Sequence, residues 1–522
     1  MSTTTSEITV VREWSPDVRH LQDVRHPPIP TTKFMLFLMC IVSVALQYVC
    51  ALEMSIIVPY LQKLGVPHKY ASMVWIGGPL MGIFVNPTVG YYSDRCAMRL
   101  GRRRPFIILQ CLVICISVMI IAFSTDIGRL LGDTMENRRV ATVLRIIGVL
   151  IIDCTVHTAQ GTVRAMMSDF SAVSHGLDVG QSTFVVWVSI GNVLGNLEAA
   201  YGKWNRWLPF LKTMACCEAC ADLKGTSITV VIFMLITTIM TVMLANEQQI
   251  SNDEVDTSST QTSGGFTAFM NILKSLRDTK PEMRKLLALT AITWLSWFPF
   301  LQYCTDWMGR EIYHGKPNGT AYEITMYNTG VREGAFGLIL TSFPFGVTSF
   351  LIPTLCRKLT SKVVWTASLI SMFLIMVGMV SIGIVSTNGD IPSPSTSSII
   401  VGPDTKTKVF VLTLFAMTGI PQAVLYNVPW SVAAELAAED GGGQGATVGV
   451  MTFVIFLSQL IVGLTAGPID GVFHQGNAPA FGIGGIIALV CAVLVVTMLP
   501  RAGNTNGVED TNGVAAARSE EA

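Results

Sequence analysis

The chain has 522 residues, of which 51% are hydrophobic and only 13% are charged, and its formal net charge is zero. Soluble domains carry about a quarter charged residues, so this composition excludes a large soluble core. The neutral balance gives no indication of a nucleic-acid or acidic partner. Residues 1–33 are polar and lack the short apolar core of a cleavable signal peptide. We therefore expect a polytopic membrane protein that enters the membrane through its first span.

Apolar stretches recur along the chain at the length that a helix needs to cross about 30 Å of hydrocarbon. Twelve spans are predicted, at residues 34–60, 70–91, 105–123, 140–167, 182–201, 226–245, 286–303, 334–355, 363–385, 409–434, 446–466 and 481–499. The order of these spans along the chain predicts an all-α fold of two six-helix bundles, 34–245 and 286–500. They are joined by a central loop, 246–285, and flanked by tails at 1–33 and 501–522.

Lysine and arginine in short loops indicate which side of a span faces the cytoplasm. The loop between the second and third spans is rich in arginine, and the central loop and the loop between the eighth and ninth spans are also basic. We therefore expect these loops and both termini in the cytoplasm. Asn318, in Asn-Gly-Thr, then falls on the outer side as a possible glycosylation acceptor.

The fourth span carries polar residues on one face. At 100° per residue, Asp153, His157, Gln160 and Arg164 fall within one narrow stripe. Charged groups that face lipid are costly, so the stripe is expected to face the bundle interior or a water-filled cavity. Arg164 lies about 16 Å beyond Asp153 along the helix axis, which excludes a direct pair.

The loop at residues 90–105 reads GYYSDRCAMRLGRRRP and fits the loop pattern of the major facilitator superfamily. Its acid and arginines can form charge-assisted bonds and meet helix ends, which predicts a latch that holds one state closed. The simpler alternative is a positively charged anchor at the membrane surface. The gating candidates in this loop are Asp94, Arg95, Arg102 and Arg103.

Longer stretches of the sequence make the resemblance more specific. Four stretches resemble sucrose/proton symporters, together with their animal and fungal relatives. They read VPHKYASMVWIGGPLMG, AITWLSWFPFLQYCTDWMGREIYHG, YNTGVREGAFGL and GIPQAVLYNVP. These belong to the glycoside-pentoside-hexuronide type within the major facilitator superfamily. The similarity runs in register from about residue 33 to residue 500 and leaves out the tails and the central loop.

The resemblance implies a proton-coupled secondary active transporter of sucrose or a related glucoside that works by alternating access. Two alternatives stay open: the same fold carrying maltose, glucose or trehalose, or a membrane sugar sensor that does not transport. No enzyme activity, metal or cofactor is expected, and the partners are a sugar and protons. We expect a monomer in the plasma membrane, with the vacuolar or another internal membrane as the alternative.

The resemblance also assigns roles within the spans. An acid eleven residues before Arg-Ala is the family pattern, which implicates Asp153 in proton coupling and sugar binding, and Arg164 in transport. Glu53 matches a carboxylate of the animal relatives, so it is a second candidate for the proton. His157 departs from the plant pattern, which has an amide there. It could share a proton with Asp153 or only hydrogen-bond its neighbours.

Sugar binding needs groups that bond hydroxyls and flat apolar faces on which the C–H faces of the ring can stack. Each candidate has an ordinary packing role as its alternative. The candidates besides Asp153 are Gln47, Asn192, Trp294, Trp297, Asn427 and Gln459.

On the outer side, Asp306, Arg310 and Glu311 match the family's charged cluster after the seventh span and are expected to gate the outer mouth. The family usually has another acid where this chain has Cys304. His68 matches a histidine near the outer entrance.

Two cysteines in the loop after the fifth span match family positions on the outer side. This match implies a local disulfide between Cys216 and Cys220.

Overall fold

The computed structural model describes residues 32–63, 74–134, 137–201, 204–213, 218–247, 280–316, 319–388, 402–439, 443–473 and 477–499. Within these ranges the regular structure is helical and contains no strand. His68, Cys216 and Asn318 lie outside the described residues, as do most of the two tails and of the central loop. What the sequence predicts for those segments stays a prediction.

The N-terminal half consists of long helices with short connections. Its helices are α1 (Lys33–Met39), α2 (Val42–Lys63), α4 (Val74–Asp94), α5 (Arg104–Leu130), α6 (Arg139–Ser174), α7 (Leu177–Tyr201), the short α8 (Trp204–Trp207) and α9 (Glu218–Leu244). A bend of 41° separates α1 from α2, within the first predicted span. Pro105, at the first turn of α5, suits a helix start because proline lacks a backbone N–H that would go unpaired there.

The C-terminal half continues the same pattern. Its helices are α12 (Pro281–Trp307) with a π-helical turn η3 (Met308–Ile312), α13 (Ala321–Asn388), α14 (Thr405–Glu439), α15 (Gln444–Phe473) and α16 (Ala478–Met498). The helix α12 begins inside the predicted central loop, 246–285. Pro281 and Glu282 in its first turn explain the earlier start, because both residue types favour a helix N-terminus.

The element α13 contains two predicted spans. It is 68 residues long, and Thr360 interrupts it with a φ of 69°. A straight helix of that length would measure about 100 Å, far more than the roughly 30 Å of a hydrocarbon core. The ranges 334–355 and 363–385 therefore fall on the two arms of α13, which are joined at Thr360 without a loop.

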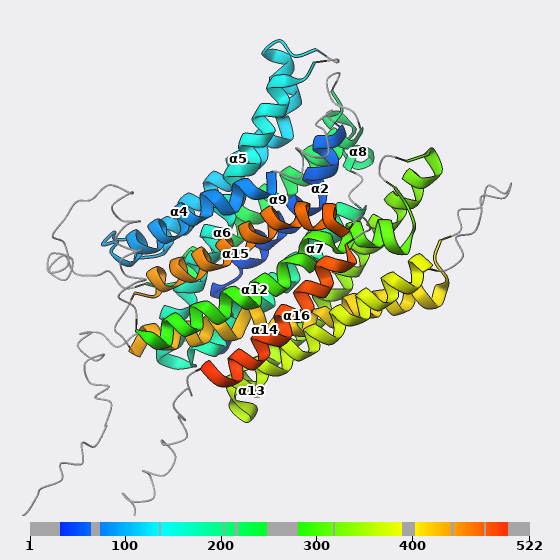
Figure 1. The fold of residues 1–522 in the computed structure, drawn as a ribbon. Helices are drawn as coiled ribbons and strands as arrows, with labels where there is room; N and C mark the ends of the chain where they lie inside the picture. Colours follow the sequence, from blue (N-terminus) through cyan, green and yellow to red (C-terminus); the bar gives the residue numbers. More distant parts are fainter. Residues whose placement is uncertain are drawn as a thin grey trace, which may run out of the picture.

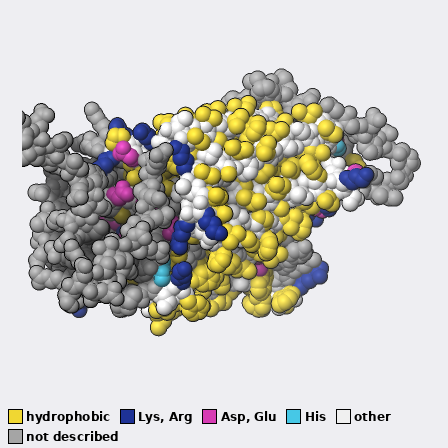
Figure 2. Space-filling model, turned by 90° about the horizontal axis from the view of Figure 1, so that it is seen from below, with side chains coloured by type: hydrophobic (Ala, Val, Ile, Leu, Met, Phe, Trp, Pro, Cys, Tyr) yellow, Lys and Arg dark blue, Asp and Glu magenta, His cyan; other side chains and the backbone are white. Residues whose placement is uncertain are grey.

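The described helices suit a membrane. By length and composition, eight helices of the described ranges can cross one, or nine if the bent pair α1–α2 forms one span. Large side chains such as Phe343 and Phe350 are about three-quarters exposed on the outside. Figure 2 shows a broad hydrophobic face with lysine and arginine gathered toward its ends. A soluble protein rarely exposes so large an apolar surface, so lipid is its solvent.

Several helix pairs join the halves, and two of them are the most extensive. The helices of the N-terminal half lie mostly at the upper left of Figure 1 and those of the C-terminal half at the lower right. Across this boundary α4 packs against α15, and α7 packs against α13. The helix α6, which carries the polar stripe, contacts α4, α7, α2 and α15. The stripe therefore lies within the protein, as its charge predicted.

Candidate functional site

Two buried carboxylates lie in the N-terminal half. Asp153 of α6 is 7% exposed and Glu53 of α2 is 6% exposed. They lie near enough for their charges to interact. Among the described residues, Glu53 Oε1 has no hydrogen-bond partner. A buried charged oxygen without a partner is costly, so this pair is suited to take up a proton or to accept a hydrogen bond from a ligand hydroxyl.

His157 joins this pair on one side. Its Nε2 atom lies 3.3 Å from Asp153 Oδ1, one helical turn away. Its ring packs edge-on against Phe456 of α15, with 5.3 Å between the ring centroids. His157 therefore contacts both the acid and the other half of the protein. The contact is compatible with proton sharing and with simple hydrogen bonding, so both readings of His157 stay open.

A chain of amides connects three helices beside the acids. Gln160 Nε2 of α6 donates to Gln47 Oε1 of α2 at 2.9 Å, and Gln47 Nε2 donates to Asn192 Oδ1 of α7 at 2.8 Å. Gly191 and Gly195 allow this approach, because a Cβ atom on either would crowd the backbone of α2. The sequence indicated Gln47 and Asn192 separately. The structure joins them directly and connects Gln47 to Gln160, which the helical stripe had already placed on the same face as Asp153.

Arg164 links the two halves further along α6. It is 4% exposed, and its Nη1 atom donates to Gln181 Oε1 at 2.8 Å and to the carbonyl oxygen of Tyr426 in α14 at 3.2 Å. The guanidinium lies over the rings of Phe184, at 4.1 Å, and Trp430, at 4.4 Å. A surface anchor would be exposed to water. The buried position and the contacts with both halves instead favour a part in the change between conformations.

The two candidate tryptophans of α12 lie in different surroundings. Trp294 packs 5.2 Å from the ring of Tyr426, and its Nε1 atom has no hydrogen-bond partner among the described residues. Trp297 is fully buried and packs against Phe300 inside the C-terminal half. The Nε1 atom of Trp297 also lacks a partner among the described residues, so the contact with Tyr426 is what favours Trp294 as a face for a ligand.

The remaining candidates also belong to the C-terminal half. Asn427 of α14 donates through Nδ2 to Ser349 Oγ at 3.2 Å and to the Ala423 carbonyl at 2.7 Å. Its Oδ1 atom is buried and lacks a partner among the described residues. Gln459 of α15 is half-buried. Asn427 thus has an acceptor to spare, while Gln459 shows no feature that separates it from an ordinary packing residue.

A charged contact closes one end of the boundary between the halves. The carboxylate of Asp94 accepts hydrogen bonds from the backbone N–H groups of Gly445, at 3.0 Å, and Ala446, at 2.7 Å. These amides begin α15, where the helix dipole favours a negative charge. Arg103, whose side chain is fully buried, bridges Asp94 and Asp169. The predicted latch therefore has the geometry of a helix cap that joins the two halves.

The other arginines of this loop take different positions. Arg102 pairs with Asp169 at 2.7 Å. Arg95 lies over the ring of Tyr91, 3.7 Å from its centroid, beside the latch. Arg102 therefore supports the latch through Asp169, whereas Arg95 packs on its own helix.

Glu247, directly after α9, stabilises the start of α5. Its Oε2 atom accepts from the backbone N–H groups of Arg103, at 2.7 Å, and Arg104, at 3.2 Å. Burial raises the pKa of the Glu247 carboxyl, and these two hydrogen bonds lower it in part. This cap could not be predicted from the sequence, because the acid lies more than 140 residues from the helix that it caps.

The charged cluster after α12 lies within the C-terminal half. Glu311 accepts hydrogen bonds from the backbone N–H groups of Asn477 and Ala478, which begin α16. Asp306 pairs with Arg310 at 2.9 Å and accepts a hydrogen bond from Asn477 Nδ2 at 2.8 Å. In this conformation the cluster ties the end of α12 to α16. Its role as an outer gate stays a prediction.

Cys220, on the same predicted side, is disulfide-bonded. Its predicted partner, Cys216, lies outside the described residues.

The contacts between the halves share a location. Asp94 with α15, Arg164 with Tyr426, and Phe456 with His157 all lie between the middle of the helices and the end that carries Asp94. The backbones of Gly90 and Gly445 also meet closely there. The structure is therefore closed at the Asp94 end.

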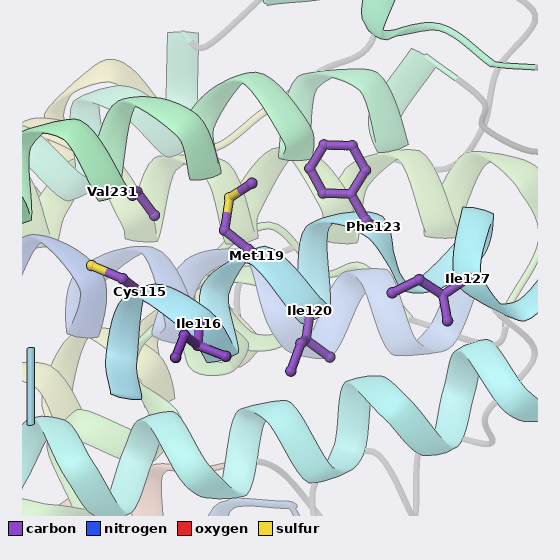
Figure 3. Close-up of a pocket in the computed structure, with 7 residues that line it drawn as sticks. All are labelled: Cys115, Ile116, Met119, Ile120, Phe123, Ile127 and Val231. Carbon is purple, nitrogen blue, oxygen red and sulfur yellow. The ribbon is translucent and has the colours of Figure 1, made fainter. Parts of the chain in front are cut away.

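An apolar groove lies away from these groups. It has a volume of about 450 Å³ and is lined by Cys115, Ile116, Met119, Ile120, Phe123 and Ile127 of α5 and by Val231 of α9. Figure 3 shows the six side chains of α5 along one helix, with Val231 on a neighbouring helix. The groove offers no polar atom to a hydroxyl, and Ile116 is 59% exposed. It is therefore part of the lipid-facing surface, unlike the polar stripe of α6.

Known proteins match the chain over most of its length. Residues 34–474 match the family described as MFS/sugar transport protein. The chain is 53% identical over 487 residues to sucrose transport protein SUT5 of Oryza sativa subsp. indica, covering 92% of this chain and 90% of that protein. It is 37% identical over 522 residues to sucrose transport protein SUC3 of Arabidopsis thaliana, covering 89% and 87%.

A solved structure shows the same fold. The proton:xylose symporter XylE bound to 6-bromo-6-deoxy-D-glucose matches with a TM-score of 0.57 at 12% identity, covering 90% of this chain and 96% of that one. At this identity the match bears on the fold alone. It agrees with the all-α, two-bundle arrangement and confirms the predicted fold class. The chain therefore belongs to the sugar transport family of the major facilitator superfamily, together with the sucrose transport proteins that its sequence resembles.

Proposed function

We propose that the chain carries sucrose, or a related glucoside, across a membrane together with a proton, by alternating access. One observation supports this most: the buried pair Asp153–Glu53 lies beside an amide chain and next to the boundary between the halves. Acids within a membrane mark proton and substrate pathways. Transporters of this build bind substrate near the midplane, between their halves. Sucrose is proposed as the sugar because the relatives that are 53% identical are named sucrose transport proteins.

The mechanism starts from the conformation that is closed at the Asp94 end. A proton from the open side binds to the Asp153–Glu53 pair and removes one of its negative charges, which lowers the cost of burying it. Sugar hydroxyls then bond the carboxyl groups and the amides of Gln47, Gln160 and Asn192. The ring of Trp294 contributes an apolar face for the sugar.

Loading is followed by a change of conformation. With sugar and proton bound, the two halves rotate relative to each other. The Asp94 contacts with α15 break, and the binding site opens to the other side. Release of the proton restores the charge of the pair and weakens its hold on the sugar.

The positive charge of the loops supports a cytoplasmic position for the Asp94 end. Uptake therefore runs from outside to inside under an inward proton gradient, in a plasma membrane or with the matching orientation in a vacuolar or other internal membrane. Asp306, Arg310 and Glu311 then lie at the outer mouth, and the transporter works as a monomer.

Reconstitution tests the proposal. The purified chain is placed in vesicles, and uptake of labelled sucrose is measured with and without an inward proton gradient. The gradient is expected to drive accumulation in the wild-type chain, while Asp153→Asn, which cannot exchange a proton, abolishes it and leaves the protein folded. Sucrose uptake that does not depend on the proton gradient would contradict the proposal. So would an Asp153→Asn variant that still accumulates sucrose. Competition by maltose, glucose and trehalose ranks the sugars, and binding without flux would identify a sensor.

A further inference from the structure

The Asp153 carboxylate occupies space beside α4 that a side chain would otherwise fill. A Cβ atom placed on Gly78 would overlap Asp153 Oδ2 and lie 3.1 Å from Oδ1. Gly78 is itself buried in the helix interface. Real Cβ atoms do not approach other atoms so closely, so a larger residue at position 78 would displace the carboxylate or separate α4 from α6.

The same face of α4 makes a second contact of this kind. Gly82, one turn after Gly78, adjoins the ring of Phe456 of α15, and a Cβ atom there would overlap that ring. Phe456 in turn packs against His157, which lies 3.3 Å from Asp153. Residues four apart share a helix face. Two glycines of α4 thus leave room for the acid of one half and for an aromatic ring of the other.

We infer that Gly78 is a positioning residue for the coupling acid, because it fixes where the Asp153 carboxylate lies relative to His157 and Glu53. The inference rests on the proposed function, since it concerns the proton that accompanies the sugar. The proton affinity of a carboxyl group depends on the charges and hydrogen bonds that it faces. Gly78 therefore sets the pH dependence of transport without touching proton or sugar.

The surroundings of Asp153 explain why position matters. Among the described residues, the groups that interact with it and can titrate are His157 and Cys154 on its own helix, and Glu53 and Cys50 on α2. From α4 and α15 come Gly78, Gly82 and Phe456, which do not titrate. A displacement by one atomic diameter would change the distances to His157 and Glu53 together. The pH at which the site loads would change with them.

The neighbouring glycine provides a matched control. A Cβ atom on Gly77 would overlap Leu150 Cδ2, the end of a flexible apolar side chain on α6. Gly77→Ala therefore crowds the same pair of helices with the same substitution but leaves the acid untouched. A difference between Gly78→Ala and Gly77→Ala separates an effect on the carboxylate from an effect on helix packing.

The test measures the initial rate of sucrose uptake against external pH for the full-length chain in vesicles. Gly77→Ala is expected to keep the wild-type pH midpoint. Gly78→Ala is expected to shift the midpoint by about one pH unit or more, the size that follows from losing one charge-assisted hydrogen bond. Equal midpoints in all three proteins, or equal shifts in both variants, would overturn the inference. Wild-type uptake that does not depend on pH would instead refute the proposed function, and the inference would fall with it.

A rescue covers the case in which Gly78→Ala does not fold. The double variant Gly78→Ala/Asp153→Ala lacks the oxygens that overlap the new methyl group, so it should recover monodisperse protein on size-exclusion chromatography. The same Asp153→Ala change should give no recovery when it is combined with Gly77→Ala, if that variant too is impaired. A double variant at position 78 that stays unfolded would show that the carboxylate is not what the methyl group displaces.

Discussion

Replacing Asp94 by asparagine should loosen the closed end of the protein. The Asp94 carboxylate accepts two backbone hydrogen bonds from the start of α15 and pairs with Arg103. Hydrogen bonds to a charged group contribute about 1.5–3 kcal/mol each. Because asparagine keeps one acceptor oxygen, we expect Asp94→Asn to weaken the contact by about 2 kcal/mol. That is roughly a 30-fold change in the ratio of closed to open molecules.

Hydrogen exchange measures this change at the bonds themselves. In Asp94→Asn, the amides of residues 443–452 should exchange roughly 30-fold faster, because exchange follows the population in which they are exposed.

Asp133 supplies a control with the same chemistry inside one half. Its carboxylate accepts from the backbone N–H groups of Val140, at 3.1 Å, and Ala141, at 2.8 Å, at the start of α6. Asp133→Asn should therefore speed exchange at 139–146 and leave 443–452 as in the wild type. Unchanged exchange at 443–452 in Asp94→Asn would refute the latch, as would an equal acceleration there in Asp133→Asn.

Two further variants probe other contacts. Arg164→Lys removes the planar guanidinium. That group lies over two aromatic rings and donates hydrogen bonds to two oxygens. Sucrose uptake should therefore fall at least about 10-fold with a smaller loss of stability, and uptake within twofold of wild type would contradict that role. Glu247→Gln keeps an acceptor for α5 but cannot ionise. Because burial raises the pKa of Glu247, its contribution to stability is full below the ordinary glutamate pKa of about 4.3 and is lost as pH rises through the raised value. The Tm of Glu247→Gln relative to wild type should therefore increase from about pH 4 to pH 7, and a constant difference would count against this.

Within single helices, much of the site could be predicted from the sequence. The 3.6-residue period puts Asp153, His157 and Gln160 on one face, and the cost of charge in lipid turns that face inward. The length and apolar character of the stretches predicted the helices. The loop around Asp94 resembled the pattern of the major facilitator superfamily, and its acid and arginines predicted a contact with a helix end.

Partners between helices could not be predicted in this way. Nothing in the sequence pairs Asp94 with Gly445, more than 350 positions away, or places Asp153 against Gly78. It also did not separate Trp294, which packs beside Tyr426, from Trp297, which lies in the core.

The division has a physical reason. The sequence by itself determined that this chain crosses a membrane as helices and which faces of those helices are polar, since these follow from local composition and period. Its motifs also carried the resemblance to a family. Only the tertiary structure decided which faces meet, because that depends on how all the side chains pack together, down to glycines that leave room for a neighbour. The position of Asp153 beside Gly78, His157 and Glu53 is one of the features that only the tertiary structure decided.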